Sequence, residues 1–346
     1  MKIELISESG RFYKVNLHCH TTVSDGKQTP EEIKETYKAL GYSAVCYTDH
    51  EVLIDHSDLT DSDFIALNGY EIAIKSDLNL STGKGEGLFM PVYHFCFISK
   101  QSDNLIMPKL FKNNPSFPGV AKEWVQKCAY DEIIDSVYYY DKAWLSDYLL
   151  TVSENGFFVN YNHPEWSLQT VADVAELKGI HSIEVANNSA FENNDNTTIH
   201  YSQLLRAGMK VFPTGSDDNH SLKSVGGAWT MLKAEELSYG ALIDAYSRGD
   251  MYASWGPEIY SLILEDGEIK IKTSSAKFLT LLSEGRYVER FADNGGGLTE
   301  AAFKYAPDKM GRYFRIEVKD AEGNVACTVP YYVRDIEQKM KENSEK

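Results

Sequence analysis

Two histidines, His18 and His20, stand two positions apart where an apolar run ends in NLHCHTTVSDG. Residues two apart in a strand point to the same face, so both imidazoles would lie side by side. Either they bind a metal ion together, or each is satisfied separately by hydrogen bonds. Comparable polar groups recur later in the chain, where TDH ends at His50 and GSDDNH contains Asp218 and His220.

The candidate metal ligands are imidazoles and carboxylates spread along most of the chain. They are His18, His20, Asp25, His50, Glu71, His94, His163, Asp218 and His220. This mixed set of nitrogen and oxygen donors is one that Zn, Mn or Fe accepts. So many ligands indicate more than one ion, and a carboxylate such as Glu71 can bridge two ions. The alternative, separate satisfaction of each polar residue, is disfavoured because HxH, TDH and DxH occur together.

The remaining histidines, His56, His181 and His200, stand in other contexts. His56 follows TDHEVLID in a predicted loop, His181 opens a predicted strand, and His200 lies in a helical stretch. Single histidines of this kind are usually structural, so we expect these to be surface or packing residues.

Short apolar runs alternate with amphipathic stretches up to about residue 257, which is typical of βα units. The seven predicted strands are 14–20, 43–50, 64–71, 92–99, 156–163, 181–188 and 210–218. A clear helix is predicted in TPEEIKETYKALG, with Thr29 as N-cap, Pro30 in the first turn and Gly41 as the stop.

Six of these seven runs end on polar residues that could do chemistry. They are His20, His50, Glu71, His163, Asn187 and the Asp217–Asp218 pair. Functional groups of parallel α/β folds gather where the carboxyl ends of the strands meet, so a site is predicted there. His94 is the exception because it stands near the start of its run. If the segment with STGKGEG made this strand return as a hairpin, His94 would reach the same end.

Residues 99–155 form an enlarged insertion with an irregular, proline-containing start. Helices are predicted near 121–140 and 142–156. The aromatic residues of the insertion could form a lid over a cleft or could pack the helices onto the sheet, and packing is the more common role. These residues are Trp124, Tyr138, Tyr139, Tyr140 and Trp144.

The sequence changes character after residue 257. Alternating apolar and polar residues with Asp-Gly and Glu-Gly turns predict a small antiparallel β domain, sandwich-like, over 258–334. This segment contains no histidine, so the chemistry is expected in residues 1–257. The predicted division is a metal-dependent hydrolase domain over 1–257, the β domain over 258–334 and a charged tail over 335–346.

Composition narrows the classes of partner and compartment. The chain has 51 acidic against 34 basic residues, a net charge of −17, which disfavours non-specific binding to nucleic acid or anionic lipid. Its five cysteines include no CxxC pair and are expected to be free thiols in a reducing compartment. No apolar run of about 18 residues and no signal-peptide core occur, so no membrane contact and a cytoplasmic location are expected.

The ordered motifs HCHTTVSDG, TDH, GYE, VYHFC, NHP and GSDDNH resemble the PHP (polymerase and histidinol phosphatase) family of metal-dependent phosphoesterases. The resemblance covers about residues 12–257. It implies an α/β fold, a distorted (β/α)7 barrel, to which the small C-terminal antiparallel β domain is appended. It also implies a trinuclear centre of Zn, Mn or Fe.

Carried over position by position, the resemblance implies three ion sites. The first would be held by His18, His20, Glu71 and Asp218. The second would be bridged by Glu71 and held also by His94 and His163, and the third would be held by Asp25, His50 and His220. Glu71, His163 and Asp218 would be the catalytic residues. Some family members have histidine where this chain has Asp25, and Asp217, adjacent to Asp218, is an alternative ligand.

The predicted reaction is metal-assisted hydrolysis of a small phosphate ester, with a hydroxide bridging two ions as the nucleophile. Asn187 and Lys223 are predicted to bind substrate because both follow strand ends, although loop residues of this kind are often only solvated. Asn162 could simply face away from the site, and Arg206 is expected to be remote from it. Long nucleic acid is the least expected substrate.

Two other functions are compatible with the same motifs. The chain could hydrolyse a non-phosphate bond, such as an amide or carbamate, with similar metals. Alternatively, it could be a non-catalytic binding protein on the same fold, which the complete ligand set argues against.

Overall fold

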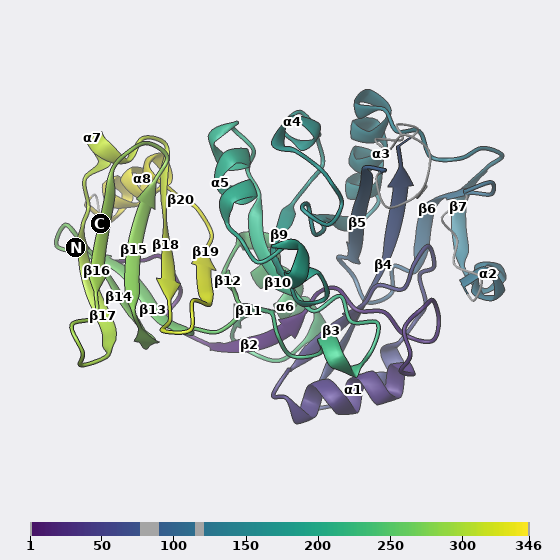
Figure 1. Cartoon of the computed structure of the whole chain (residues 1–346), viewed down its shortest axis with the longest axis horizontal. Helices are drawn as coiled ribbons and strands as arrows, with labels where there is room; N and C mark the ends of the chain where they lie inside the picture. Colours follow the sequence, from purple (N-terminus) through teal and green to yellow (C-terminus); the bar gives the residue numbers. More distant parts are fainter. Residues whose placement is uncertain (1, 77–89, 115–120, 345–346) are drawn as a thin grey trace.

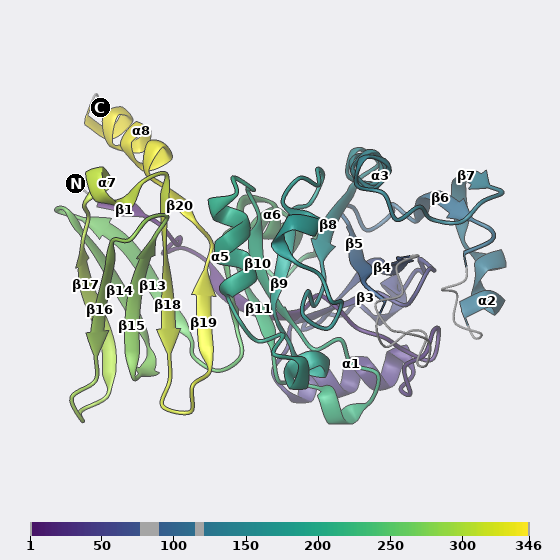
Figure 2. The ribbon, with the colours of Figure 1, turned by 45° about the horizontal axis from the view of Figure 1, so that its top comes forward.

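The computed structural model of the chain describes residues 2–76, 90–114 and 121–344. The C-terminal β strands lie at one end of the long axis, and β6, β7 and α2 lie at the other (Figure 1). Both termini lie at the end formed by the C-terminal β strands, as the turned view also shows (Figure 2). Among the described helices, none combines the length and apolar character that a bilayer-spanning helix needs.

Strands predominate over helices in the described parts of the chain. The strands up to residue 254 are β1 (Lys2–Glu4), β2 (Arg11–Asn16), β3 (Ala44–Tyr47), β4 (Ile65–Lys75), β5 (Val92–Ser99), β6 (Ile106–Phe111), β7 (Ala129–Ile134), β8 (Phe157–Tyr161), β9 (Ser182–Asn187), β10 (Phe212–Ser216), β11 (Trp229–Ala234) and β12 (Met251–Ser254). The later strands are β13 (Ile259–Glu265), β14 (Glu268–Ala276), β15 (Phe278–Ser283), β16 (Val288–Ala292), β17 (Leu298–Lys304), β18 (Tyr313–Lys319), β19 (Val325–Thr328) and β20 (Tyr331–Tyr332). The α-helices are α1 (Pro30–Ala39), α2 (Ala121–Trp124), α3 (Lys142–Glu154), α4 (Val171–Val174), α5 (Ile199–Arg206), α6 (Tyr239–Arg248), α7 (Pro307–Met310) and α8 (Val333–Ser344). The 3₁₀ helices are η1 (Ser57–Leu59), η2 (Val125–Lys127), η3 (Asn188–Asn193) and η4 (Leu222–Ser224).

All seven predicted strands exist, and they are neighbours in one large sheet in the order β10-β9-β8-β5-β4-β3-β2. The pairs β2–β3, β3–β4, β8–β9 and β9–β10 are parallel. Their carboxyl ends therefore point to one edge, where the predicted polar residues follow. This part of the chain is a mixed α/β fold.

Strand β5 is antiparallel to both of its neighbours, β4 and β8. The hairpin considered for the fourth predicted strand is therefore present, and Ala73 pairs with His94. The STGKGEG segment lies outside the described residues. Because β5 runs in the opposite direction, its beginning lies beside the carboxyl ends of β4 and β8. His94 thus reaches the same edge as the other candidate ligands.

Among the described strands, the predicted barrel is not a closed ladder, since β2 pairs with β11 rather than with β10. Beyond the strand ends, an isolated parallel bridge between Cys19 and Asn219 joins the segments that follow β2 and β10, and side chains add further contacts. The Gly215 N–H donates to Thr230 Oγ1 at 3.1 Å, and that hydroxyl donates to the Gly215 carbonyl at 3.0 Å. The Asp217 N–H donates to Asn16 Oδ1 at 2.9 Å. These contacts bring the loop after β10 against the end of β2, which positions ligands from both.

Helix α1 begins as its sequence predicts. The Glu32 N–H donates to Thr29 Oγ1 at 3.3 Å while the Thr29 N–H donates to Glu32 Oε2 at 3.0 Å, which completes a capping box. The helix ends before Gly41, whose φ of +78° suits a residue without Cβ. On its inner face, the Tyr37 hydroxyl donates to Asp217 Oδ2 at 2.9 Å. Helix α1 thereby fixes the loop that carries Asp218.

The helix predicted over 121–140 is wrong for most of its length. Helix α2 ends at Trp124, and 129–134 is strand β7, which pairs in parallel with β6. Pairing with a distant segment decides the conformation here, which local periodicity does not reveal. The helix predicted over 142–156 is α3, which confirms that part of the prediction. The aromatic residues pack, as Trp144 stacks on Tyr148 with ring centroids 5.3 Å apart.

The C-terminal strands form two antiparallel groups. One is the sheet β1-β13-β14-β17, and the other is the run β19-β18-β15-β16 at the end of the large sheet. The turn between β13 and β14 has positive φ at Asp266 and Gly267, as a two-residue hairpin requires. Residues 2–4 pair with β13, although the predicted division placed them with the N-terminal unit. The predicted charged tail is helical from Val333.

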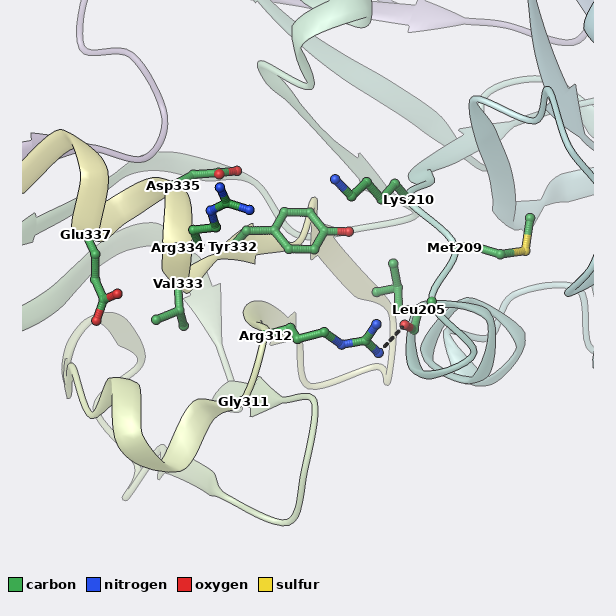
Figure 3. Close-up of a pocket in the computed structure, with 11 residues that line it drawn as sticks. Leu205, Met209, Lys210, Gly311, Arg312, Tyr332, Val333, Arg334, Asp335 and Glu337 are labelled. Carbon is green, nitrogen blue, oxygen red and sulfur yellow. Dashed lines mark hydrogen bonds between the residues drawn. The ribbon is translucent and has the colours of Figure 1, made fainter.

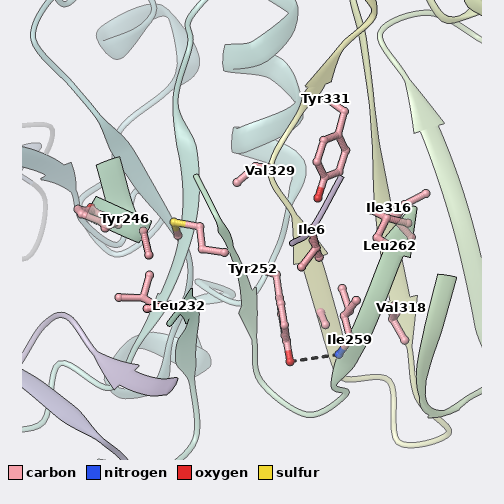
Figure 4. Packing of buried hydrophobic residues seen from close by; sticks show 14 of the residues in the cluster. Ile6, Leu232, Tyr246, Tyr252, Ile259, Leu262, Ile316, Val318, Val329 and Tyr331 are labelled. Carbon is pink, nitrogen blue, oxygen red and sulfur yellow. Dashed lines mark hydrogen bonds between the residues drawn. The ribbon is translucent and has the colours of Figure 1, made fainter. Parts of the chain in front are cut away.

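One apolar core joins these strands to the rest of the sheet (Figure 4). Leu262 of β13 and Ile316 of β18 are both completely buried in it. Tyr252 of β12 contributes its ring, and its hydroxyl accepts a hydrogen bond from the Ile259 N–H at 3.1 Å. The large sheet thus continues from the strands that position the site into the C-terminal strands, through the pair β12–β19.

Candidate metal centre

The predicted ligands come together at the edge where the strands of the seven-stranded run carry their polar residues. His18 and His20 follow β2, His50 follows β3, Glu71 lies in β4 and His94 in β5. His163 follows β8, and Asp218 and His220 follow β10. Asp25 comes from the loop after β2. Side-chain donor atoms that are far apart in the sequence therefore meet, as His18 Nε2 and Asp218 Oδ1 do at 3.2 Å.

Glu71 lies at the centre of this group and is 1% exposed. Imidazole nitrogens of five histidines lie 3.0–3.5 Å from its two carboxylate oxygens, and these are His18, His20, His50, His94 and His163. Oε1 faces His18, His94 and His163, whereas Oε2 faces His20 and His50. A carboxylate that presents its two oxygens to two sets of imidazoles is arranged to bridge ions.

Donor atoms within 4.8 Å of one another form overlapping groups. One group is His20, Asp25, His50 and His220; a second is His18, His163 and Asp218; a third is Glu71, His94 and His163. Cys96 also lies near His18 and Glu71, but burial raises the pKa of its thiol to about 11, which makes it a poor ligand.

Buried polar atoms without partners, and the spacing of the donor atoms, indicate that this group can hold divalent ions. Asp218 Oδ1 and His20 Nδ1 are buried and make no hydrogen bond. His20 Nε2 lies 3.1 Å from His18 Nε2 and 3.0 Å from Asp218 Oδ1. Two ligands bound to one ion at about 2.1 Å are roughly 3.0–3.4 Å apart, so these spacings are those of ligands that share an ion. Buried donors without partners are costly unless something binds them.

The charges in this group are balanced internally. Burial opposes ionisation of Glu71 and Asp218, but the surrounding imidazoles bring the pKa of both carboxyls far below the usual value. Burial also opposes the charging of His20, but the adjacent carboxylates of Asp218 and Glu71 raise its pKa to about 10. Burial and the nearby His20 lower the pKa of His50 to about 3. Metal ligation needs neutral imidazoles, so an ion would displace protons here.

The group opens into a cavity of 310 Å³. Its lining comprises Asp25, His50, Glu71, His94, His163, Trp166, Ser189, Ala190, Asp218 and His220. No lysine or arginine occurs among these described lining residues. Bound ions would therefore add positive charge for an anionic substrate that no lysine or arginine of this lining supplies.

Residues 16–163, from the end of β2 to the histidine after β8, match the family model of the PHP domain. This segment is similar in sequence to the PHP domain family. Apart from Asp218 and His220, the candidate ligands all lie within the matched residues. Among curated proteins, no sequence is significantly similar to the chain.

Three solved structures are similar to the chain with low identity. A two-domain protein from Bacteroides vulgatus, which contains a predicted PHP-like metal-dependent phosphoesterase, is 13% identical over 95% of this chain and 98% of its own, with a TM-score of 0.40. An amidohydrolase from Chromobacterium violaceum with bound sulfate and no metal is 15% identical over 61% and 89%, with a TM-score of 0.35. A lesion-specific endonuclease from Pyrococcus furiosus is 10% identical over 69% and 56%, with a TM-score of 0.36. None of these likenesses decides the function.

Glu184 supports two of the candidate ligands without belonging to the predicted set. His18 Nδ1 donates to its Oε1 at 2.9 Å, so that Nε2 of His18 faces Asp218 and Glu71. The other oxygen accepts from the His163 N–H at 3.0 Å. Sequence reasoning missed Glu184, although a carboxylate inside the buried run SIEVAN was an available signal.

Asp49 organises the loop that carries Asp25. Its carboxylate accepts hydrogen bonds from the N–H and hydroxyl groups of Thr21 and Ser24, at 2.6–3.1 Å. Asp49 is 2% exposed and directly precedes His50. It therefore holds the loop rather than an ion, which explains the aspartate in TDH.

The adjacent aspartates after β10 have different surroundings. Asp217 accepts from the N–H groups of Gly226, Gly227 and Ala228 at 2.6–3.0 Å and from Tyr37, so both of its oxygens are engaged. Burial raises its pKa to about 6. The neighbouring carboxylate, that of Asp218, turns into the donor group. This geometry favours Asp218 as the ligand.

The predicted substrate-binding residues, Asn187 and Lys223, are not among the described residues that line the cavity. Asn187 is completely buried; its amide group donates to Glu184 and Asp218 at 3.0 and 3.2 Å, and its Oδ1 accepts from the Ala190 N–H. Its amide thereby contacts a candidate ligand, Asp218. Lys223 is exposed on η4 and does not line the cavity.

The structure also places Asn162 and Arg206, whose positions relative to the site were predicted from the sequence. Asn162 does not face away, because its amide donates to Glu71 Oε1 at 2.7 Å. Arg206 lies at the end of α5, remote from the cavity as expected. The structural histidines are also as expected: His56 packs on Tyr47, and His200 contacts Glu165 at 3.1 Å.

A larger cavity, of 380 Å³, lies between α5 and α8 (Figure 3). Arg312 points into it, but its guanidinium is paired with Glu284 at 2.5 Å and donates to the Leu205 carbonyl at 3.3 Å. Neither histidine nor cysteine occurs among the described residues that line it. The candidate metal ligands therefore favour the smaller cavity as the functional site.

Proposed function

We propose that this chain is a metal-dependent phosphoesterase that hydrolyses a small phosphate ester at a trinuclear centre. The observation that carries the proposal is the convergence of overlapping donor groups on the shared carboxylate of Glu71, within the segment similar to the PHP domain family. The metal ions would be Zn, Mn or Fe, as the imidazole and carboxylate donors favour.

In this proposal, the ions would be held by the ligand sets that overlap in the structure. His18, His20 and Asp218 would hold one ion, Glu71 would connect it to the ion held by His94 and His163, and Asp25, His50 and His220 would hold the third. Bound ions would supply a nucleophile at neutral pH and neutralise the phosphoryl oxygens. Glu71, His163 and Asp218 would be the catalytic residues because they face the cavity and belong to the shared groups.

The residues behind the ligands have a positioning role. Glu184 fixes the tautomer of His18, and Asn162 holds Oε1 of Glu71 in place. Such contacts behind a metal ligand restrict its orientation and so keep its donor atom aimed at the ion. The cavity, of 310 Å³, has room for a small substrate.

A second candidate is hydrolysis of an uncharged amide or carbamate. The specific observation in its favour is that the described cavity lining lacks lysine and arginine, the side chains that most often bind a phosphate group. The resemblance of the sequence motifs to a family of phosphoesterases keeps the phosphate ester as the first candidate.

An activity screen separates these functions. Purified protein, loaded in turn with Mn, Zn and Fe, is assayed on phosphomonoesters, nucleotides, a short oligonucleotide and small amides, and His20→Ala is assayed beside it. The proposal predicts hydrolysis of at least one small phosphate ester that falls by at least 100-fold in His20→Ala. Turnover of amides alone, or equal rates in both proteins, would contradict it.

A further inference from the structure

Trp166 stands out among the cavity residues because it is large, apolar and exposed. It is 45% exposed, whereas His94 and His163 beneath it are buried. Its ring lies edge-on to both, with centroids 5.3 Å from His94 and 5.0 Å from His163. A tryptophan left partly open above a donor group offers surface to whatever enters the cavity.

The backbone around Trp166 is firmly held. Its N–H donates to Asp195 Oδ2 at 2.6 Å, and the preceding N–H, that of Glu165, donates to Oδ1 at 2.9 Å. Asp195 is itself 4% exposed. The side chain of Glu165 also contacts His200 of α5 at 3.1 Å. Because the amides of Glu165 and Trp166 are both tied to one buried carboxylate, the backbone that carries the ring is held beside the cavity.

The remaining wall of the cavity has little else with which to recognise an organic group. Apart from the candidate ligands, the described lining contains Trp166, Ser189 and Ala190. The Ser189 hydroxyl is already used, since it donates to the Asp218 carbonyl at 2.6 Å. Ala190 contributes a methyl group. The indole is thus the one extended surface in that lining that is not a candidate ligand.

We propose that Trp166 determines substrate specificity by contacting a flat, apolar ring in the alcohol portion of the substrate. The substrate class would be phosphate esters of aromatic or heteroaromatic alcohols, or esters that carry such a ring close to the phosphate. The inference rests on the proposed phosphoesterase function and adds the identity of the leaving group. It differs from a purely structural role, in which Trp166 would only pack against His94 and His163.

Kinetics on a matched pair of esters distinguish these roles. Phenyl phosphate and glycerol 1-phosphate are compared for the wild type, Trp166→Leu and Trp166→Phe, with metal content measured in each protein. Trp166→Leu is expected to lower kcat/KM for phenyl phosphate by roughly 3- to 10-fold, the range of one aromatic contact, and for glycerol 1-phosphate by less than twofold. Trp166→Phe, which keeps an aromatic ring, is expected to have a kcat/KM for phenyl phosphate closer to that of the wild type than Trp166→Leu has. Equal losses on both esters, or losses that follow metal content, would overturn the inference.

A binding measurement supplies a readout independent of turnover. Phenylphosphonate and methylphosphonate, whose C–P bonds resist hydrolysis, are titrated against tryptophan fluorescence. In the wild type, phenylphosphonate is expected to quench the fluorescence and methylphosphonate is not. The control Trp144→Phe, in which the lost ring packs outside the cavity, should behave like the wild type. In Trp166→Phe, neither phosphonate is expected to quench. Equal quenching in all three proteins would overturn the inference.

The two proposals fail in different ways. Ester hydrolysis that needs His20 but is insensitive to the ring at residue 166 would overturn the inference and leave the proposed function intact. Ring-dependent quenching without hydrolysis of any ester would support the ring site and count against the phosphoesterase.

Discussion

At the scale of single residues, His18 shows how neighbours determine a ligand. Its Nδ1 is occupied by Glu184, so only Nε2 is directed at Asp218 and Glu71. Carboxylates that fix the tautomer of a ligating histidine raise its basicity and its affinity for the ion. Glu184 also holds the His163 backbone, which gives one buried side chain control of two ligands.

The substitution Glu184→Gln tests this control. It keeps the volume and removes the charge, so metal affinity is expected to fall by about 10- to 100-fold, the usual effect of losing such a contact. Affinity is measured by competition with a chromogenic chelator. Glu192→Gln, an exposed change on η3, is the matched control and should bind metal as the wild type does. Unchanged affinity in Glu184→Gln would show that Glu184 does not control the two ligands.

The sequence predicts the ligands better than their supports. His18, Glu71 and Asp218 have chemical types and places at strand ends that mark them as donors. Glu184 and Asn162 were missed or misjudged because their roles depend on which strands are neighbours, and Glu184 contacts His18 from 166 positions away. Trp166 was missed because exposure at a cavity mouth is a property of the folded surface.

At the scale of elements, loops and strand directions bring the ligands together. The antiparallel β5 carries His94 to the shared edge, and a hairpin was one of the arrangements that the sequence allowed. The loop after β2 carries Asp25 and is fixed by Asp49. In contrast, β7 was predicted as a helix, because its pairing with β6 leaves no mark in the local pattern.

Replacing Asp49 with alanine tests the role of this loop. Four hydrogen bonds to residues 21–24 would be lost. Asp25 would then lose its fixed place, and occupancy of the group with His20, His50 and His220 is expected to fall. Metal content per chain, measured by mass spectrometry after dialysis, should drop by about one ion while the fold persists by circular dichroism. Asp58→Ala, on the exposed side of η1, should keep the wild-type content; equal content in both variants would refute the role.

At the scale of the whole molecule, the sheet that positions the site continues into the C-terminal strands. Buried Arg315 of β18 reaches back to Ser202 of α5 at 2.6 Å and pairs with Glu317 at 2.6 Å. The site therefore rests on a framework that extends beyond the PHP domain match. The sequence predicted the antiparallel character of these strands from their alternation, but not that β1 would join them, since a three-residue strand carries too little pattern.

A partly buried histidine outside the candidate metal centre makes the stability of this framework depend on pH. His181 packs between Phe158 and Tyr246, with ring centroids 4.4 and 4.8 Å away. Burial lowers its pKa to about 4, below the ordinary 6.5. The unfolded chain thus takes up a proton between these values that the folded chain excludes. The stability that neutral His181 contributes is complete above pH 6.5 and is lost as the pH falls towards 4.

Chemical denaturation at pH 7, 6 and 5 checks this dependence. Relative to His181→Phe, the wild type is expected to lose about 1–2 kcal/mol of unfolding free energy between pH 6.5 and 5. Other titrating groups are common to both proteins and cancel in the difference. A constant difference across this range would show that His181 does not carry the effect.

The central claim is that scattered donors bind a cluster of divalent ions through Glu71, and metal stoichiometry tests it most directly. The protein is reconstituted with Mn or Zn, dialysed, and analysed by mass spectrometry beside Glu71→Gln. We predict more than one ion per wild-type chain, with a limit near three, and a loss of at least one ion in the variant. Less than one equivalent in the wild type, or the same content in both proteins, would contradict the claim.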